Sequence, residues 1–168
     1  FYAIGGKPRK PRQVFPDIGP ASVKKYLSIK RGVDAARKEQ GAFLRLRLLD
    51  VKKQTVSENC YWVPDESGNY SGLQKMASAK LQATAKRITK DSIAVTLRNP
   101  ADGPVAFFNR LALVDAGTKQ RILPAFYNDN YVSVMPGEEK TITIDYTPGS
   151  NNNLAVELYG WNVREEYI

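Results

Sequence analysis

Carboxylates are the residues with which this chain could do acid–base or nucleophilic chemistry, because the sequence has no histidine and one cysteine. Adjacent carboxylates occur at Asp65-Glu66, Glu138-Glu139 and Glu165-Glu166. Neighbouring residues of a strand point to opposite faces, so such a pair does not flank one bond from the same side. We therefore expect solvated charges in turns or near the terminus, and we predict no catalytic residue in the chain.

Metal and cofactor sites are also disfavoured by the composition. A zinc site needs several cysteine or histidine ligands, and a Ser-His or Cys-His nucleophile needs a histidine. Cys60 alone permits no disulfide within the chain. Gly5-Gly6 lacks the strand–loop–helix context of a phosphate-binding loop. The sequence therefore predicts neither a metal nor a cofactor.

Aromatic rings offer a second kind of chemistry, because planar rings can stack on sugar faces. The stretch Val105–Glu138 is the densest in patterned hydrophobic residues, and it contains an aromatic and amide cluster at Phe126–Tyr131. The residues that could form a carbohydrate contact or a domain contact are Tyr127, Asn128, Asp129, Asn130, Tyr131 and Trp161, and Tyr159 could join such a platform. We favour rings that fill the sandwich or its contact with another domain, because large amphipathic rings are common at interfaces. The Asn-Asp-Asn run could instead fix its turn through bonds from side chain to backbone.

The positive charge lies in the first third of the chain. Residues 1–60 carry 14 Lys and Arg against 5 Asp and Glu, a net +9, whereas residues 61–168 carry 11 against 12, a net −1. The basic segment at residues 7–31 lacks interleaved aromatics and a recognition motif, so we interpret it as a solvated, partly mobile segment. An acidic surface on a neighbouring domain and a polyanion remain alternatives; nucleic acid is not an expected partner.

The length of 168 residues allows one large domain or two small ones, with 42% apolar residues to build a core. There is no apolar run near the ~18–20 residues that span a bilayer, and residues 1–4 do not resemble a signal peptide.

Residues 1–63 are predicted to hold a linker and a partial immunoglobulin-like β domain. Pro and Gly dominate residues 1–20, Ala21–Ile29 could begin a strand, and Lys30–Gln40 could be a helical turn or a loop. Alternation then predicts a β-hairpin from Ala42–Leu49 and Thr55–Val63.

Residues 64–79 are predicted to be a linker between domains, because Pro64–Gly72 concentrates turn-forming residues. Residues 80–168 then show about seven short strands separated by turns: Lys80–Thr89, Asp91–Asn99, Val105–Asp115, Arg121–Tyr127, Tyr131–Met135, Lys140–Thr147 and Leu154–Trp161. In the third of them, Asn109 interrupts the apolar set. This spacing predicts an all-β fold, an immunoglobulin-like antiparallel β-sandwich preceded by part of a second one.

Four segments carry a resemblance to a known family: NCYWVP at Asn59–Pro64, RNPADGPVAFFNRLALVD at Arg98–Asp115, ILPAFYNDNYVSVMPGE at Ile122–Glu138 and GWN at Gly160–Asn162. Together they resemble the C-terminal immunoglobulin-like region of glycoside hydrolase family 2 enzymes, in the branch of β-mannosidases, exo-β-glucosaminidases and endo-β-mannosidases. The resemblance covers about Leu44 to Asn162, and its most specific part is FYNDNY together with PGE. The first forty residues depart from it, being more basic than expected.

The resemblance implies a fragment of a retaining exo-β-glycosidase. In that family the two catalytic glutamates lie in a (β/α)₈ barrel, for which ~250 residues are needed, so neither is assigned here. The expected partners are the catalytic barrel and other domains of the same parent chain, with carbohydrate as a further candidate, and the family favours an extracytoplasmic location. We therefore expect a non-catalytic accessory region. The alternatives are an independent carbohydrate-binding module that uses Tyr127, Tyr131 and Trp161, and a polyanion-binding protein that uses residues 7–31.

Overall fold

The computed structural model describes residues 1–4, 9–149 and 153–168, which divide into two compact units, Phe1–Met76 (unit 1) and Ala77–Ile168 (unit 2). Gly5-Gly6, the first residues of the basic stretch and most of the loop predicted at Gly149–Asn153 lie outside the described residues. The two units are described separately below.

Unit 1 is built on a hairpin. Its elements are β1 (Tyr2–Ala3), α1 (Lys30–Lys38), β2 (Ala42–Leu49), β3 (Thr55–Val63) and the 3₁₀ helix η1 (Ser71–Lys75). The predicted hairpin is confirmed: β2 and β3 pair antiparallel, with Phe43 opposite Trp62. The strand suggested at Ala21–Ile29 is wrong, because that segment is irregular up to α1 and the free side of β2 pairs with β1 instead.

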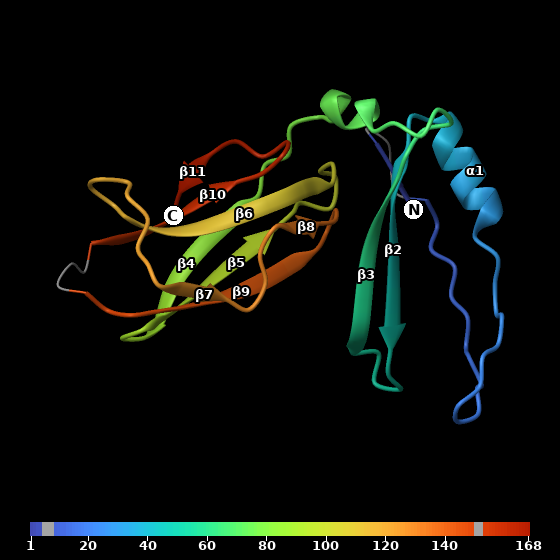
Figure 1. Ribbon diagram of the computed structural model, residues 1–168, viewed down its shortest axis with the longest axis horizontal. Coiled ribbons are helices and arrows are strands. Elements are labelled where there is room, and N and C mark those ends of the chain that lie inside the picture. The colour runs from blue at the N-terminus through green and yellow to red at the C-terminus, as the bar shows by residue number, and fades with distance from the viewer. Residues whose placement is uncertain (5–8, 150–152) are drawn as a thin grey trace. The chain divides into compact units, whose positions relative to one another are not determined.

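The core of unit 1 is small and lies at one end of the hairpin. One buried cluster consists of Ala36, Ala42, Leu44 and Val63, with Phe1 and Val33 packed against them, and Phe43 and Leu73 are buried outside this cluster. Figure 1 shows α1 beside this end of the hairpin, while the other end of β2 and β3 extends past the helix. The far half of the hairpin therefore has little to pack against within unit 1.

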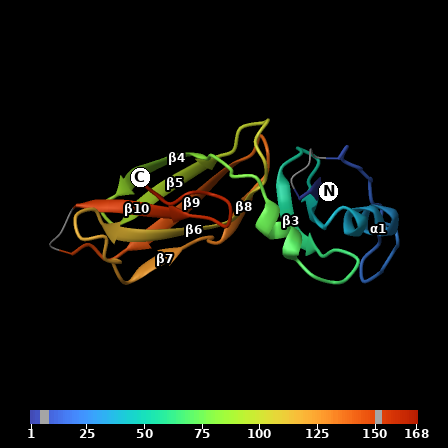
Figure 2. The ribbon, with the colours of Figure 1, turned by 90° about the horizontal axis from the view of Figure 1, so that it is seen from above.

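Unit 2 is a sandwich of two antiparallel four-stranded sheets, with strand orders β11-β10-β6-β8 and β4-β5-β9-β7. Its strands are β4 (Gln82–Thr89), β5 (Ser92–Arg98), β6 (Ala106–Asp115), β7 (Ala125–Tyr127), β8 (Val132–Val134), β9 (Glu139–Tyr146), β10 (Leu154–Tyr159) and β11 (Glu166–Tyr167). Figures 1 and 2 show the two layers, with β6 and β10 in one and β4 and β5 in the other. The predicted all-β, immunoglobulin-like fold is confirmed.

The core of unit 2 fills the space between the sheets. Ile93, Val95 and Leu97 on β5 are buried as their alternation predicts. On β6 the polar Asn109 stands in the inward row with Phe107, Leu111 and Leu113, and it is fully buried. Its amide nitrogen donates to the carbonyls of Ala106 (2.8 Å) and Val132 (2.9 Å), which offsets the cost of burying a polar side chain.

β7 is shorter than the predicted strand at Arg121–Tyr127. Arg121 forms an isolated bridge with Val114 on β6, whereas Ala125–Tyr127 pairs with β9 in the other sheet. The chain therefore crosses between the sheets around Pro124, which has no N–H to donate to a ladder. β1 and β11 were not predicted, since two residues are too few to show a periodicity.

Candidate functional site

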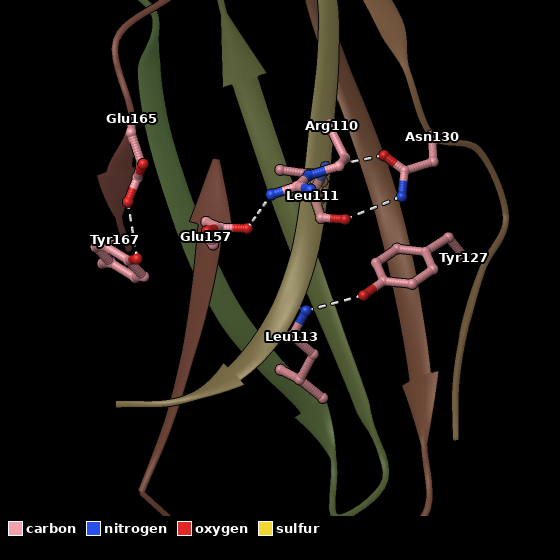
Figure 3. Close-up of polar contacts among 8 residues, drawn as sticks. All are labelled: Arg110, Leu111, Leu113, Tyr127, Asn130, Glu157, Glu165 and Tyr167. Atoms are coloured by element: carbon pink, nitrogen blue, oxygen red, sulfur yellow. Dashed lines mark hydrogen bonds and ion pairs between the residues drawn. The ribbon is translucent and has the colours of Figure 1, made fainter. Parts of the chain in front are cut away.

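The aromatic and amide cluster lies along the edge of β6. β8 pairs with β6 only at Ala106 and Asn109, so beyond that point another group must bond the backbone of β6. The side chain of Asn130 does so at Leu111: Oδ1 accepts the Leu111 N–H at 2.8 Å, and Nδ2 donates to the Leu111 carbonyl at 3.0 Å (Figure 3). One amide thus makes both bonds that a strand residue would make.

Tyr127 continues this edge from the opposite sheet. Its hydroxyl accepts the Leu113 N–H at 2.8 Å, and Ile122 donates its N–H to the Leu113 carbonyl at 2.9 Å. Figure 3 shows the ring reaching from β7 towards β6. Because the ring is half-buried, desolvation raises the pKa of Tyr127, which favours the neutral hydroxyl. This side chain ties one sheet to the other.

The side chains of the two residues after Tyr127 also accept backbone N–H groups. Asn128 donates its N–H to the Thr143 carbonyl (3.1 Å), and its Oδ1 accepts the Thr143 N–H (2.7 Å), which extends the ladder between β7 and β9. Oδ1 of Asp129 accepts the Asn130 N–H at 2.8 Å. These contacts are of the kind that terminates and orders a turn.

Tyr131 and Trp161 belong to a different group, the aromatic patch of Phe107, Phe108, Tyr131 and Trp161. Tyr131 and Trp161 are 52% and 53% exposed, whereas Phe107 is buried beneath them. Ring centroids are 5.1 Å apart for Phe108 and Tyr131, 5.6 Å for Phe107 and Phe108, and 6.4 Å for Phe107 and Trp161. The structure thus separates the six predicted site residues into a bonded edge and an exposed patch.

Phe108 is a patch residue that sequence reasoning missed. Both Phe108 (φ 54°) and Tyr131 (φ 56°) have left-handed backbone conformations, which are unfavourable for bulky side chains. The register of β6 and β8 shifts between Ala106 and Asn109, which places Phe108 in a bulge. Plain alternation along β6 carries no signal of such a bulge.

Asn162, the last residue of the GWN segment, fixes the start of β6. Its Oδ1 accepts the Phe107 N–H at 2.9 Å, and its Nδ2 donates to the carbonyls of Val105 (2.9 Å) and Ala77 (2.8 Å). The Trp161 N–H donates to the Phe107 carbonyl at 2.9 Å. This segment therefore holds the patch, the bulge and the first residue of unit 2 together.

The polar side chains on β6, β10 and β11 form a second network (Figure 3). Arg110 pairs with Glu157, and the Tyr167 hydroxyl donates to Glu165 at 2.8 Å. That hydrogen bond raises the pKa of Tyr167, and Lys119 Nζ lies 4.1 Å from the centre of its ring. Each charge here faces a partner of the same protein, which is the arrangement of a structural network.

The other predicted carboxylate pairs also make backbone contacts. Oε2 of Glu138 accepts the Met135 N–H at 2.8 Å, and Oδ1 of Asp65 accepts the Asn69 N–H at 3.0 Å. Across residues 1–4, 9–149 and 153–168, no group of three or more His, Cys, Asp or Glu side chains could hold a metal ion. No helix in these ranges is long and apolar enough to cross a membrane.

The described part of the basic segment is partly neutralised within unit 1. Arg9 pairs with Glu39 at 2.7 Å, and Lys30 pairs with Asp34 at 2.7 Å. Lys24 Nζ lies 5.2 Å from the centre of the Tyr26 ring. Such exposed pairs contribute little to stability, but they reduce the positive potential of the segment.

Comparison with known proteins finds exo-beta-D-glucosaminidases and an endo-beta-mannosidase. The chain is 27% identical to an exo-beta-D-glucosaminidase of Arthroderma benhamiae over 98% of this chain and 20% of that protein. It is 28% identical to a mannosylglycoprotein endo-beta-mannosidase of Lilium longiflorum over 74% of this chain and 14% of that protein. The chain thus spans a fifth or less of the length of these curated relatives.

The fold has a counterpart in the exo-chitosanase of Amycolatopsis orientalis. Its crystal structure superposes with a TM-score of 0.66 at 26% identity, over 77% of this chain and 18% of that one. The family described as the exo-beta-D-glucosaminidase Ig-fold domain matches residues 59–163, which include all of the edge and patch residues above. The chain therefore belongs to the family of exo-β-D-glucosaminidase immunoglobulin-fold domains.

Proposed function

We propose that this chain is a non-catalytic accessory region of a longer glycosidase of the exo-β-glucosaminidase type. The observation that carries the proposal is the family match over residues 59–163, together with the small share of each relative that the chain spans. In this proposal the reaction, with a retaining mechanism, belongs to a catalytic barrel elsewhere in the parent protein. The chain contributes packing against that barrel and its neighbouring domains.

The carboxylates of the chain support a non-catalytic role. A glycosidase places two carboxyl groups on opposite sides of one glycosidic bond. Here Glu157 faces Arg110, Glu165 faces the Tyr167 hydroxyl and Glu138 faces a backbone N–H. Their contacts therefore account for these carboxylates without a substrate.

Hydrolysis assays test this proposal. We expect the 168-residue chain to release no nitrophenol from 4-nitrophenyl β-D-glucosaminide or β-D-mannoside. We expect the longer natural polypeptide to cleave the glucosaminide faster than the mannoside, with retention of the anomeric configuration in the first product. Hydrolysis by the chain alone would contradict the non-catalytic role. A faster reaction with the mannoside would support the mannosidase type, to which the lily relative points.

We propose two separate roles for the site residues. Tyr127, Asn128, Asp129 and Asn130 hold the edge and turn of unit 2, and Tyr131 and Trp161 supply a contact surface for another domain of the parent protein. The exposure of these two rings beside Phe108 supports the second role, since aromatic residues are enriched in interface cores.

Carbohydrate is the alternative occupant of the patch, because Tyr and Trp rings also stack on sugars. Calorimetry of the 168-residue chain with chitosan and mannan oligosaccharides at millimolar concentration separates the two. We expect no heat of binding. If heat is seen and is lost in Tyr131→Ala and Trp161→Ala but kept in Tyr159→Ala, the carbohydrate-binding role replaces the domain contact.

A further inference from the structure

Asn69-Tyr70-Ser71 forms the tripeptide Asn-X-Ser, in which X is not proline. This tripeptide is the acceptor pattern of N-linked glycosylation. No other asparagine of the sequence has Ser or Thr two residues after it. Such a short pattern also arises by chance, so the geometry of its loop must decide whether it can serve as an acceptor.

The tripeptide lies in the loop between β3 and η1, and all three of its residues are exposed. The loop is held at its two ends by the buried residues Val63 and Gly72. A Cβ at Gly72 would lie 2.3 Å from the Gln40 carbonyl oxygen, so the chain packs closely at that end. A Cβ at Gly68, by contrast, would have no atom within 4 Å, so the space beside Asn69 is open. The loop is therefore anchored at its ends and accessible where the asparagine lies.

Hydrogen bonds to Asp65 close the loop around Asn69. The Asn69 N–H donates to Asp65 Oδ1 at 3.0 Å, and the Asp65 N–H donates to the Asn69 carbonyl at 3.0 Å. The Gly68 N–H donates to the Asp65 carbonyl at 3.1 Å. Bonds of this kind define a compact turn, since the aspartate side chain takes the place of a backbone acceptor. Asn69 therefore occupies a defined position at the surface of unit 1.

The side chain of Asn69 meets Ser71. Asn69 Oδ1 accepts the Ser71 hydroxyl at 2.7 Å and the Ser71 N–H at 3.0 Å. Because a backbone N–H can only donate, the amide atom that faces Ser71 is the oxygen. The amide nitrogen Nδ2 makes no hydrogen bond to any residue in the described part of the chain. The hydroxyl and the amide that define the acceptor pattern are thus side by side, and the nitrogen is available for reaction.

We infer that Asn69 is an acceptor for N-linked glycosylation when the protein is exported across a membrane that carries an oligosaccharyltransferase. The donor is an oligosaccharide joined to a lipid through a diphosphate. Asn69 Nδ2 attacks C1 of the first sugar, and a C–N bond forms as the bond from C1 to the diphosphate oxygen breaks. The lipid diphosphate leaves with the electron pair, the Nδ2 proton passes to a carboxylate of the transferase, and nothing is oxidised or reduced. This modification goes beyond the proposed function and requires no glycosidase activity.

A glycan at Asn69 also identifies a face of unit 1 that meets water. An oligosaccharide is bulky and solubilising, so the loop that carries it does not lie in a contact between domains. In the longer natural polypeptide the loop from Asp65 to Ser71 therefore faces solvent, and unit 1 packs against its neighbours through other faces.

Glycan transfer to the folded 168-residue chain tests the acceptor. The chain is incubated with a purified oligosaccharyltransferase and a lipid-diphosphate-linked oligosaccharide, and mass spectrometry before and after peptide-N-glycosidase locates the modified residue. We expect glycosylation at Asn69 in the parent chain and in Ser71→Thr, and none in Ser71→Ala, whose folding is checked by circular dichroism. A parent chain that stays unmodified while the free peptide of residues 66–74 is modified would overturn the inference. Modification of Ser71→Ala would also contradict it.

Asn162 provides a matched control, because its Nδ2 donates to the carbonyls of Ala77 and Val105. Arg164→Ser, at an exposed position, places the same tripeptide pattern at Asn162. In this folded variant we expect Asn69 to be modified and Asn162 to stay unmodified, since its nitrogen is held by two backbone acceptors. Equal modification of both would contradict the role of the loop.

The longer natural polypeptide, secreted from a eukaryotic cell, gives the decisive result. We expect the tryptic peptide that contains Asn69 to carry a glycan. If Asn69 is unmodified while the polypeptide hydrolyses the glucosaminide, the glycosylation site fails and the proposed function stands. If Asn69 is modified while neither glycoside is hydrolysed, the glycosylation site stands and the proposed function fails.

Discussion

Asn130 illustrates how a single side chain can replace a strand residue. Its amide presents one acceptor and one donor at the spacing of a peptide group, and both meet Leu111. A buried or half-buried edge must be satisfied in this way, because an unpaired backbone group costs about 1–3 kcal/mol. The hydroxyl of Tyr127 accepts the N–H of the next inward residue, Leu113.

The first prediction compares two Asn→Asp changes. Asn130→Asp replaces the Nδ2 donor by a carboxylate oxygen facing the Leu111 carbonyl, so we expect the free energy of unfolding to fall by about 1–3 kcal/mol at pH 7. Asn128→Asp keeps the oxygen that accepts the Thr143 N–H and lies at an exposed position, so we expect less than about 0.5 kcal/mol. Urea titration measures both. Equal losses would show that the amide of Asn130 is not what completes the edge.

The second prediction concerns alkaline pH. Burial raises the pKa of Tyr127 in the folded state, whereas in the unfolded chain it has the ordinary value of about 10. The unfolded state therefore loses this proton first, and the stability from Tyr127 is fully present below pH ~10 and is lost as pH rises through the raised pKa. Tyr127→Phe should show a flatter decline in unfolding free energy across this window than the parent chain, while Tyr159→Phe, at an exposed position, should decline as the parent does. A parallel decline in Tyr127→Phe would contradict this account.

At the scale of elements, β6 is the strand to which most of the features described above are bonded. It pairs with β10 along most of its length, with β8 at its start, and with side chains or loop backbone elsewhere. At its bulge Phe107 and Asn109 are buried and Phe108 is exposed. The turn after β10 must approach this bulge closely, and Gly160 permits it.

The third prediction is a loss of stability in Gly160→Ala. A Cβ at this position would lie 2.4 Å from Asn109 Oδ1 and 3.0 Å from Val163 Cβ. Asn109 has little room to move, because its Nδ2 holds two carbonyls. We expect a loss of about 1–3 kcal/mol, as for overpacking in a core. Gly19→Ala, whose nearest atom would be Ser22 Oγ at 3.8 Å, should be neutral in the same thermal or urea assay. A neutral Gly160→Ala would mean that the backbone near Trp161 adapts.

At the scale of the whole molecule, the two units have very different cores. The buried cluster of unit 2 has fifteen residues from both sheets, whereas the cluster of unit 1 has four at one end of a hairpin, with Phe43 and Leu73 buried outside it. Since burial of apolar surface is the main favourable contribution to folding, unit 1 has far less to offset its chain entropy. Unit 2 thus has a large buried cluster of its own, whereas unit 1 has a small one.

The fourth prediction is that unit 1 unfolds before unit 2. The chain has two tryptophans, Trp62 in unit 1 and Trp161 in unit 2, so Trp161→Phe leaves a reporter for unit 1 and Trp62→Phe leaves a reporter for unit 2. We expect the Trp62 fluorescence to change at a lower urea concentration than the Trp161 fluorescence. Coincident transitions would show that the two units unfold as one cooperative body.

The sequence determined the fold class and the β2–β3 hairpin, because period-two alternation and turn residues act locally. It also marked Tyr127, Tyr131 and the Asn-Asp-Asn run as unusual. Only the tertiary structure decided what they do, since the partners of Asn130 and Tyr127 are backbone groups of β6 that lie 19 and 14 residues away in the chain. The bulge at Phe108 and the burial of Asn109 depend likewise on which strands meet. Periodicity is set by a residue's neighbours in the chain, and a site is set by its neighbours in space.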